Sequence, residues 1–276
     1  MISAQTRLFA LLGDPVGHSL SPLIQNAAAR AVDADGVYVA LRCGAEDVAG
    51  FMRGLSRAGG GGNVTVPHKE RAASVLDAPR EAVRRTGACN TFWLEGGQVV
   101  GDNTDVEGFR QALQHFLGAS AAEGQRVLLL GAGGAARAAL LALVDDGVNQ
   151  VCIVNRSGER ARSMARRIGG ARARVLDGPG EWHDQSFDLV VNATSLGLKP
   201  DDELPLDLAR LGRAGAVMDL VYGQDGTPFV RHAESLGIRA TDGKEMLVRQ
   251  AAASFELWWK EPAPLEVMRG ALEAGS

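Results

Sequence analysis

The chain has 276 residues, of which 46% are hydrophobic and 22% are charged, a composition typical of folded globular proteins and unlike collagen, coiled coils or long disordered segments. Its 29 basic and 33 acidic side chains leave a formal charge of −4, without the basic excess that nucleic-acid binders carry. No run of 18 apolar residues occurs, so we expect neither a membrane span nor export.

Three cysteines, Cys43, Cys89 and Cys152, lie far apart in the chain and form no Cys-x-x-Cys pair. Their odd number and wide spacing indicate neither a disulfide framework nor a thiolate zinc site. We therefore expect no metal site and a reducing, cytoplasmic location. Glycine, with 35 residues, is much more frequent than average, which indicates a fold with many turns or close backbone approaches.

Short apolar runs alternate with longer helical patterns in the first hundred residues, as expected when crossover helices join strands. The pattern predicts strands at 8–12, 37–41 and 64–66 and helices at 22–32 and 48–57. This part of the chain therefore indicates one α/β unit.

A small hairpin and a helix are predicted next. Residues 91–94 and 99–100 flank Glu95-Gly96-Gly97, which predicts two strands joined by a tight turn. Over 105–117, apolar side chains recur at helical spacing. We expect this helix to lead into a second domain.

The middle of the chain has the pattern of a nucleotide-binding turn. An apolar strand over 126–130 runs into a glycine turn, and a helical pattern covers 137–144. Gly131, Gly133 and Ala136 fit Gly-x-Gly-x-x-(Gly/Ala), which combines a tight turn, access for a diphosphate and close helix packing. The pattern predicts dinucleotide binding at a helix N-terminus. A glycine turn that serves packing alone is the alternative.

Further strands are predicted at 151–154, 189–192, 217–221 and 238–240, with helices between them. This spacing predicts a doubly wound parallel sheet. One long helical pattern covers 244–259. Because it lies beyond the last of these strands, we expect it to cross back onto the first unit.

The residues after the strand at 151–154 indicate which dinucleotide is bound. An acidic side chain there would bind the ribose of NAD, whereas arginine accommodates the 2′-phosphate of NADP. The chain has Asn155-Arg156-Ser157, with Arg160 three residues further on, so NADP is favoured. Alternatively, Ser157 only caps a helix and the arginines form a solvated face.

Several side chains at loop ends and helix starts have the chemistry of a site. Lys69 and Thr65 follow a strand, where an ammonium can exchange a proton with a hydroxyl that becomes a carbonyl. Asp105 opens a predicted helix, and Ser21-Pro22 has the pattern of an N-cap followed by proline. Each feature alone also fits a structural role, as a solvated lysine, a helix-starting acid or a cap.

Eight motifs occur along the chain in a defined order. They are Gly13–Pro22, Asn63–Lys69, Gly87–Thr91, Gly101–Asp105, Gly131–Ala135, Asn155–Ser157, Asn192–Ser195 and Asp242–Gln250. This ordered set resembles the shikimate dehydrogenase family. The resemblance runs from Leu11 to Gln250, nearly the whole chain.

The resemblance implies a role for each matched residue and implies no metal ligand. Lys69 and Asp105 match the catalytic pair of the family. The residues implied to bind substrate are Ser19, Ser21, Thr65, Asn90, Asp105, Tyr222 and Gln250. Those implied to bind the cofactor are Gly131, Ala132, Gly133, Gly134, Ala135, Asn155, Arg156, Ser157, Arg160, Thr194, Gly243 and Met246.

The resemblance also implies a fold and an activity. We expect an α/β protein with a Rossmann-type doubly wound parallel sheet in an NADP-binding domain over 106–241. A smaller α/β domain, substrate-binding and catalytic, would be built from both chain ends, 1–105 and 242–276. The implied reaction is the NADP-dependent interconversion of shikimate and 3-dehydroshikimate by hydride transfer, in aromatic amino-acid biosynthesis through chorismate. The partner would be a small cyclic hydroxy acid, and the protein a monomer or a homodimer.

Two departures from the family pattern lie beside matched residues. Cys89 stands where an aliphatic residue is expected before Asn90, and Lys244-Glu245 stand in place of an apolar residue and a glycine before Met246. These changes leave quinate or an aminoshikimate open as the substrate, with NAD or NADP as the cofactor. A non-catalytic NADP-binding sensor is disfavoured, because a sensor would not need the catalytic pair.

Overall fold

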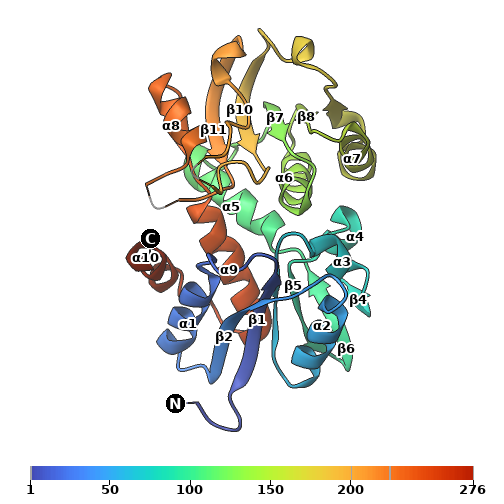
Figure 1. Ribbon diagram of the computed structural model, residues 1–276, viewed down its shortest axis with the longest axis vertical. Coiled ribbons are helices and arrows are strands. Elements are labelled where there is room, and N and C mark those ends of the chain that lie inside the picture. Colours follow the sequence, from blue (N-terminus) through green and yellow to red (C-terminus); the bar gives the residue numbers. More distant parts are fainter. Residues whose placement is uncertain (1, 200, 224, 276) are drawn as a thin grey trace. The chain divides into compact units, whose positions relative to one another are not determined.

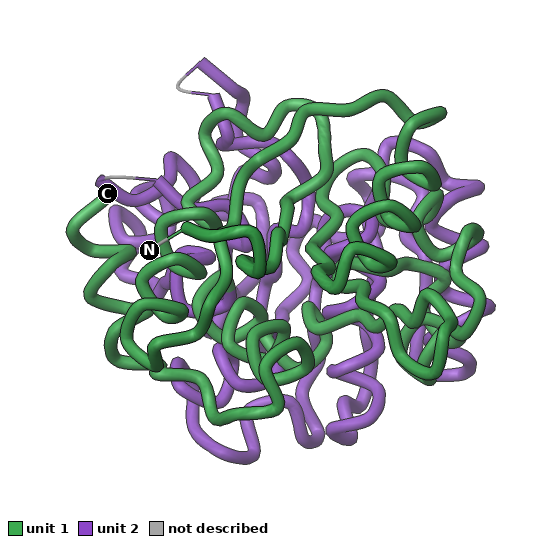
Figure 2. Tube along the Cα trace, turned by 90° about the horizontal axis from the view of Figure 1, so that it is seen from below, with its two compact units in different colours: residues 1–108, 247–276 green, residues 109–246 purple. Residues whose placement is uncertain are grey.

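The computed structural model describes residues 2–199, 201–223 and 225–275. The chain divides into two compact units, unit 1 with residues 1–108 and 247–276 and unit 2 with residues 109–246 (Figure 2). Each unit contains one six-stranded sheet. The two units are equal in length. The unit that holds both chain ends was expected to be the smaller one, but it also includes most of α9 and all of α10 at the C-terminal end.

The unit boundaries fall three to five residues beyond the predicted domain boundaries, within two helices. Helix α5 (Asp105–Leu117) begins in unit 1 and continues into unit 2. Helix α9 (Lys244–Trp259) begins in unit 2 and continues into unit 1. The boundary between the units therefore lies within the first turn of each helix. No sequence pattern predicts a domain boundary inside a helix.

Unit 1 has a mixed sheet with strand order β2-β1-β3-β5-β6-β4. Strands β1, β2 and β3 are parallel to one another, and β5 is antiparallel to both β3 and β6. The strands are β1 (Arg7–Gly13), β2 (Gly36–Arg42), β3 (Gly61–Val64), β4 (Ala78–Pro79), β5 (Thr91–Glu95) and β6 (Gln98–Asp102). The other helices of this unit are α1 (Ser21–Ala31), α2 (Val48–Arg57), α3 (Lys69–Ala73), α4 (Glu81–Thr86) and α10 (Leu265–Gly275).

The predicted hairpin is confirmed as the β5–β6 pair. Glu95 pairs with Gln98, so the loop contains only Gly96 and Gly97, with φ of 59° and 79°. A two-residue hairpin loop with two positive φ angles matches the twist of the flanking strands and favours glycine at both positions. The local sequence therefore sets the register of this hairpin.

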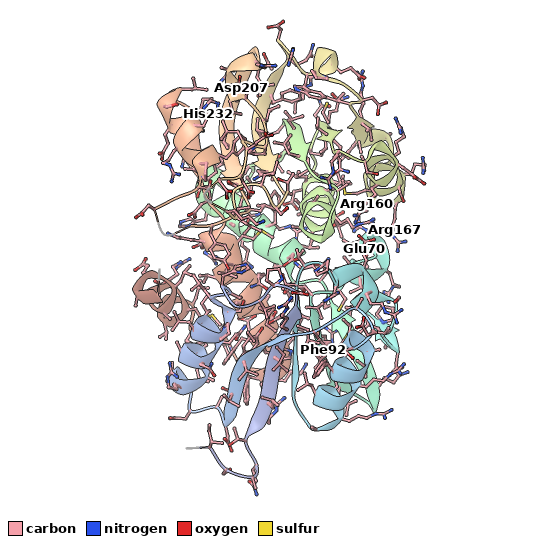
Figure 3. All side chains as sticks on the ribbon, in the orientation of Figure 1. Glu70, Phe92, Arg160, Arg167, Asp207 and His232 are labelled. Carbon is pink, nitrogen blue, oxygen red and sulfur yellow. The ribbon has the colours of Figure 1, made fainter. Side chains whose placement is uncertain are left out.

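The glycine-rich run before β3 shows where close backbone approach is needed. A Cβ atom on Gly60 would collide with the carbonyl oxygen of Leu8. One on Gly61 would lie 2.5 Å from the carbonyl oxygen of Phe92, whose side chain is fully buried (Figure 3). The high glycine content is thus in part a packing requirement of the β1–β3–β5 region.

Both faces of the unit 1 sheet are buried, because alternate side chains of β1 enter different cores. Ala10 and Leu12 pack with Met52 of α2. On the opposite face, where α9 runs along the sheet (Figure 1), the Phe9 ring lies 4.9 Å from the ring of Trp258. Helix α9 therefore packs as part of unit 1, as expected from its place in the chain beyond the last strand of the parallel sheet.

Unit 2 has six parallel strands in the order β12-β11-β10-β7-β8-β9. This is the strand order of a dinucleotide-binding Rossmann sheet, and it confirms the predicted doubly wound fold. The strands are β7 (Arg126–Leu130), β8 (Gln150–Val154), β9 (Ala173–Val175), β10 (Ser186–Asn192), β11 (Arg213–Asp219) and β12 (Arg239–Thr241). Its other α-helices are α6 (Gly134–Asp145), α7 (Gly158–Met164) and α8 (Pro228–Ser235). A short π-helix (Ala165–Gly169) and 3-10 turns at Gly170–Arg172, Pro179–Glu181 and Leu208–Arg210 complete the described helical segments.

Candidate active site

A lysine and an aspartate form a close ion pair in unit 1. Lys69 Nζ lies 2.5 Å from Asp105 Oδ2, and the two side chains are only 13% and 6% exposed. Little water reaches a pair at this depth, so its charges interact more strongly than those of a surface pair. The pair can therefore hold and pass a proton at a defined place.

The local fold explains why these two residues meet. Lys69 opens the short helix α3, and its carbonyl oxygen accepts a hydrogen bond from the backbone of Cys89 at 2.9 Å. Asp105 opens α5, where a carboxylate is favoured by the helix dipole. Cys89 itself is fully buried, and burial raises the pKa of its thiol to about 12. It therefore acts as a small apolar side chain rather than as a reactive group.

Two further predicted residues join the pair. Asn90 Nδ2 donates to Asp105 Oδ1 at 2.8 Å and lies 3.4 Å from Gln250 Oε1. The backbone at Gln250 passes close to α5, since a Cβ atom on Gly108 would lie 2.7 Å from Gln250 Cβ. Four of the predicted residues, Lys69, Asp105, Asn90 and Gln250, thus form one connected cluster.

The remaining predicted residues of unit 1 lie on two neighbouring loops. Thr65 donates its backbone N–H to the carbonyl oxygen of Leu12 at 2.8 Å, and its methyl group lies 2.5 Å from the place that a Cβ atom on Gly13 would take. Ser21 donates its backbone N–H to the hydroxyl of Ser19 at 3.3 Å. The two serines are thus linked to each other, and Thr65 lies beside the start of their loop.

Ser21 does not cap helix α1. The N-cap residue is Leu20, which makes no side-chain cap, and Ser21 is the first helical residue, followed by Pro22. The prediction that Ser21 is the N-cap is therefore wrong by one position. The backbone of Ser21 is already helical, so the preceding residue, Leu20, is the N-cap. The hydroxyl of Ser21, in a residue that is 7% exposed, remains a candidate for another task.

In unit 2, the predicted cofactor residues follow the carboxyl ends of the parallel strands. Gly131 follows β7, Asn155 follows β8, Thr194 follows β10, and Gly243 follows β12. In open parallel sheets, ligands bind at this edge, where the strand order reverses. The topology thus collects residues that are more than a hundred positions apart in the sequence.

The glycine turn after β7 has the backbone of a phosphate-binding loop. Gly131 has a φ of 112°, and a Cβ atom there would lie 2.8 Å from the carbonyl oxygen of Ala193. Gly133 is the N-cap of α6, makes no side-chain cap, and has open space where a Cβ atom would be. The N-terminal N–H groups of α6, from Gly134 and Ala135, are therefore placed to bind an anion.

The loop after β8 carries the polar residues that were predicted to select the cofactor. Asn155 Nδ2 donates to the carbonyl oxygen of Ser157 at 2.8 Å. Ser157 is the N-cap of α7 and accepts a hydrogen bond from the backbone of Arg160 at 3.4 Å, so its capping role is confirmed. Arg156 and Arg160 are both exposed, and Figure 3 marks Arg160 at α7.

A buried carboxylate that sequence reasoning missed supports the loop after β10. Asp219 accepts hydrogen bonds from Thr227 Oγ1 at 2.6 Å and from Asn192 Nδ2 at 2.8 Å. Asn192 Oδ1 in turn accepts from the backbone and the hydroxyl of Thr194, at 3.1 and 2.7 Å. Burial raises the pKa of Asp219 to about 6. Through Asn192, this network therefore fixes the position of Thr194, and the groups that donate to Asp219 in it are all uncharged.

The last predicted residues of unit 2 lie around the start of α9. Gly243 donates its backbone N–H to Val221 at 2.9 Å, next to Tyr222, and Met246 is 7% exposed. Lys244 lies 3.9 Å from Asp242 Oδ2. The unexpected polar residue at 244 thus has a carboxylate beside it.

The described part of the chain contains neither a metal-binding cluster nor a membrane-spanning helix. Across 2–199, 201–223 and 225–275, no group of three or more His, Cys, Asp and Glu side chains has the arrangement of a metal site. In the same ranges, no helix has both the length and the apolar character needed to cross a membrane.

Fold and site together define a class: a two-unit α/β protein with a Rossmann sheet and phosphate loop in one unit and a buried lysine–aspartate pair in the other. Three family models match the chain. They describe a shikimate dehydrogenase substrate binding domain (residues 11–92), a shikimate / quinate 5-dehydrogenase (112–197) and a shikimate 5′-dehydrogenase C-terminal domain (243–273).

Full-length relatives agree with these matches. A shikimate dehydrogenase (NADP(+)) of Desulfitobacterium hafniense is 39% identical and is covered over 96% of both chains. The structure of shikimate dehydrogenase from Aquifex aeolicus is 33% identical, with a TM-score of 0.89 and 99% of both chains covered. That of the Thermus thermophilus enzyme with NADP(H) and shikimate is 33% identical, with a TM-score of 0.84 and 98% and 100% of the chains covered. The chain belongs to the shikimate dehydrogenase family.

Proposed function

We propose that this protein is an NADP-dependent dehydrogenase that interconverts shikimate and 3-dehydroshikimate. The observation that carries the proposal is the buried pair of Lys69 and Asp105, with Nζ and Oδ2 2.5 Å apart, in a chain whose full-length relatives are named shikimate dehydrogenase (NADP(+)). A binding protein without activity would not need a buried proton carrier of this kind.

The pair supplies the proton chemistry of the reaction. When bound, NADPH would supply the hydride from nicotinamide C4 for ketone reduction, and NADP+ would accept it there in alcohol oxidation. In the direction of ketone reduction, the ammonium of Lys69 donates a proton to the carbonyl oxygen as the hydride reaches the carbon. In the direction of alcohol oxidation, the hydroxyl proton returns to Lys69. The carboxylate of Asp105 orients Lys69 and stabilises its charged form.

The residues of unit 2 fit NADP. The N-terminus of α6 offers N–H groups to the diphosphate, with open space at Gly133 for close approach. Arg156 and Arg160 are exposed beside the end of β8, where they would bind the 2′-phosphate through charge-assisted hydrogen bonds. The other cofactor residues in this proposal are Ala132, Asn155, Ser157, Thr194, Gly243 and Met246.

The residues of unit 1 fit a hydroxylated ring acid. The hydroxyls of Ser19 and Ser21, which lie in one loop where the Ser21 backbone N–H donates to the Ser19 hydroxyl, would bind the carboxylate. Thr65, Asn90 and Gln250 would bind the ring hydroxyls, together with Tyr222 of unit 2. We therefore assign substrate binding to 1–105 and 242–276 and NADP binding to 106–241. The three cysteines are all free and buried, which supports the cytoplasm as the compartment.

A substrate panel tests the proposal. Initial rates at 340 nm are measured with shikimate, quinate and an aminoshikimate, each with NADP and with NAD. The proposal predicts the highest kcat/KM for shikimate with NADP. A higher kcat/KM on quinate would reassign the substrate, and a higher value with NAD would overturn the cofactor. Binding of NADP without turnover of any substrate would favour a sensor.

A further inference from the structure

Three buried hydroxyl groups form a triangle behind the candidate active site. Thr91 Oγ1 lies 2.8 Å from Ser254 Oγ and 3.1 Å from Thr104 Oγ1, and Thr104 Oγ1 lies 3.0 Å from Ser254 Oγ. The exposed fractions of Thr91, Thr104 and Ser254 are 0%, 5% and 0%. The triangle joins strand β5, the residue before α5 and the middle of α9, all in unit 1.

Two side-chain amides hold this triangle from opposite sides. Asn63 Nδ2 donates to Thr91 Oγ1 and to Ser254 Oγ, both at 2.9 Å, and Asn63 Oδ1 accepts from the hydroxyl of Tyr38 at 2.8 Å. On the other side, Asn90 Nδ2 donates to Thr104 Oγ1 at 3.0 Å. Buried polar groups are costly unless they are bonded, so the complete pairing of this network is a specific arrangement.

One assignment of the hydroxyl hydrogens uses each of them once. Ser254 donates to the carbonyl oxygen of Gln250 at 2.9 Å. Thr104 donates to Ser254, and Thr91 donates to Asn90 Oδ1 at 3.0 Å. In this assignment, Ser254 Oγ accepts the hydrogen bond that the hydroxyl of Thr104 donates. Without it, that hydrogen would turn to Asn90 Oδ1, which lies 3.2 Å away and already accepts from the Thr91 hydroxyl and the Thr104 backbone N–H. A third donor would compete for the two lone pairs of this oxygen and displace the amide of Asn90.

The network fixes which way the amide of Asn90 faces. The backbone N–H of Thr104 donates to Asn90 Oδ1 at 2.7 Å, so a flipped amide would bring two donors together. With Oδ1 held there, Nδ2 faces Asp105 Oδ1 at 2.8 Å. The other oxygen, Oδ2, is then directed to Lys69 Nζ. The orientation of the proton carrier therefore depends on Asn90, and that of Asn90 on the hydroxyl triangle.

We propose that Ser254 is a positioning residue for the reaction, acting through Thr104 and Asn90 on the carboxylate of Asp105. Its hydroxyl lies within hydrogen-bond distance of Asn63, Thr91, Thr104 and the carbonyl oxygen of Gln250, so its effect on Asp105 is indirect. The inference rests on the proposed function for its reaction, but the residues and contacts that carry it are independent of which ring acid is turned over. It predicts a loss in kcat that exceeds any loss in substrate binding.

The test is Ser254→Ala, with Ser56→Ala as a matched control. Both serines are fully buried in unit 1, but Ser56 Oγ has no hydrogen-bond partner. We expect Ser254→Ala to lower kcat about tenfold, since small misplacements of reacting groups cost up to about a hundredfold. KM for both substrates should stay within about twofold. Ser56→Ala should leave kcat and both KM values unchanged.

A second comparison separates positioning from general destabilisation. Asn90→Ala removes the residue through which Ser254 acts, so adding Ser254→Ala to it should not lower kcat further. Ser254→Thr, which keeps a hydroxyl, should recover part of the lost rate. Equal kcat for wild type and Ser254→Ala, or the same tenfold loss in the Asn90→Ala background, would overturn the inference. Wild-type rates are measured first, so a wild type without turnover of shikimate counts against the proposed function instead.

Discussion

Two buried aspartates, one in each unit, have similar burial and different surroundings. Asp105 of unit 1 shares a short ion pair with Lys69. Asp219 of unit 2 is fully buried and is bonded to Thr227, Asn192 and a backbone N–H, all of them neutral donors. The same side-chain type is thus placed beside a proton carrier in one unit and beneath a loop in the other.

The difference shows what separates a reacting carboxylate from a structural one. Neutral donors only partly offset desolvation, so burial raises the pKa of Asp219 to about 6. Its partners fix Asn192 and, through it, Thr194. Asp105 instead lies against an ammonium that can give up a proton. A buried carboxylate is therefore a candidate for catalysis when its partner can exchange a proton, and burial alone is not sufficient.

The largest effect is expected when the proton carrier beside Asp105 is removed. Lys69→Ala should lower kcat about 10³-fold, within the range that general acid–base groups contribute. The Kd of NADP should be unchanged, because Lys69 belongs to unit 1 and not to the Rossmann sheet. Steady-state rates and fluorescence titration with NADP measure the two quantities.

The control for that variant is Lys260→Ala, which removes a lysine of the same unit that is 62% exposed and lies 3.7 Å from Glu95. It should leave kcat unchanged. A Lys69→Ala enzyme with a rate near that of wild type would show that Lys69 is an ordinary partly buried charge.

The second prediction concerns the pH dependence of stability at Asp219. Because its pKa is raised to about 6 in the folded protein, the folded state binds a proton more readily than the unfolded chain between about pH 4 and pH 6. The contribution of Asp219 to the free energy of unfolding is therefore highest when it is protonated. It falls by about 3 kcal/mol as pH rises through the folded pKa.

Asp219→Asn stays neutral at every pH and should lack this fall. The difference in unfolding free energy between Asp219→Asn and wild type, measured by urea denaturation, should grow by about 2 kcal/mol from pH 4 to pH 7. Asp225→Asn removes an exposed carboxylate of the same unit and controls for net charge. A pH-independent difference would mean that burial does not penalise the charge of Asp219.

The third prediction concerns cofactor selection in unit 2. Arg156→Ala should raise the Kd of NADP about 10- to 100-fold, the loss expected for a charge-assisted hydrogen bond. The Kd of NAD should change little, since NAD lacks the 2′-phosphate. Arg162→Ala is the control, because Arg162 lies on helix α7, directly after the loop that holds Arg156, but pairs with Asp177 at 2.6 Å. An equal loss for both cofactors would remove Arg156 from the 2′-phosphate site.

The smallest effect is expected at the serine loop of unit 1. Ser21→Ala should raise KM for shikimate about tenfold, the loss of one hydrogen bond to a carboxylate, and leave kcat nearly unchanged. The melting temperature should not fall, because Ser21 is not the cap of α1. Ser74→Ala, at an exposed serine of the same unit, is the control. A lower melting temperature with an unchanged KM would assign Ser21 a structural role.

The sequence predicts the long elements well. The helices at α2, α5 and α9 have the predicted bounds, because each shows apolar residues at helical spacing over ten or more positions. Short elements are not predicted by apolar spacing. Helix α3 has five residues and β4 has two, one of them Pro79, so neither is long enough to show a period. Their positions depend on tertiary contacts, such as the bond between Cys89 and Lys69.

The candidate site also has residues that the sequence predicts and residues that it does not. Lys69, Asp105 and Asn90 stand in motifs, and the structure brings them together. Ser254 lies 150 or more positions from its partners Thr91 and Thr104, and Asp219 meets Thr227 and Asn192 from separate segments. A single sequence carries no mark of such distant pairing. A polar residue in an otherwise apolar stretch, like Ser254 among the alanines before Phe255, is the nearest sequence indication.

The most direct test of the account is the rate of shikimate-dependent NADP reduction in Lys69→Ala, Asp105→Ala and the double variant. If the two residues move one proton as a unit, each single variant should lose about 10³-fold in kcat. The double variant should then be only a few-fold slower than either single one, because the loss of a shared function is not additive. A double variant whose loss equals the product of the two single losses would show that Lys69 and Asp105 act independently, and would contradict the proposed pair.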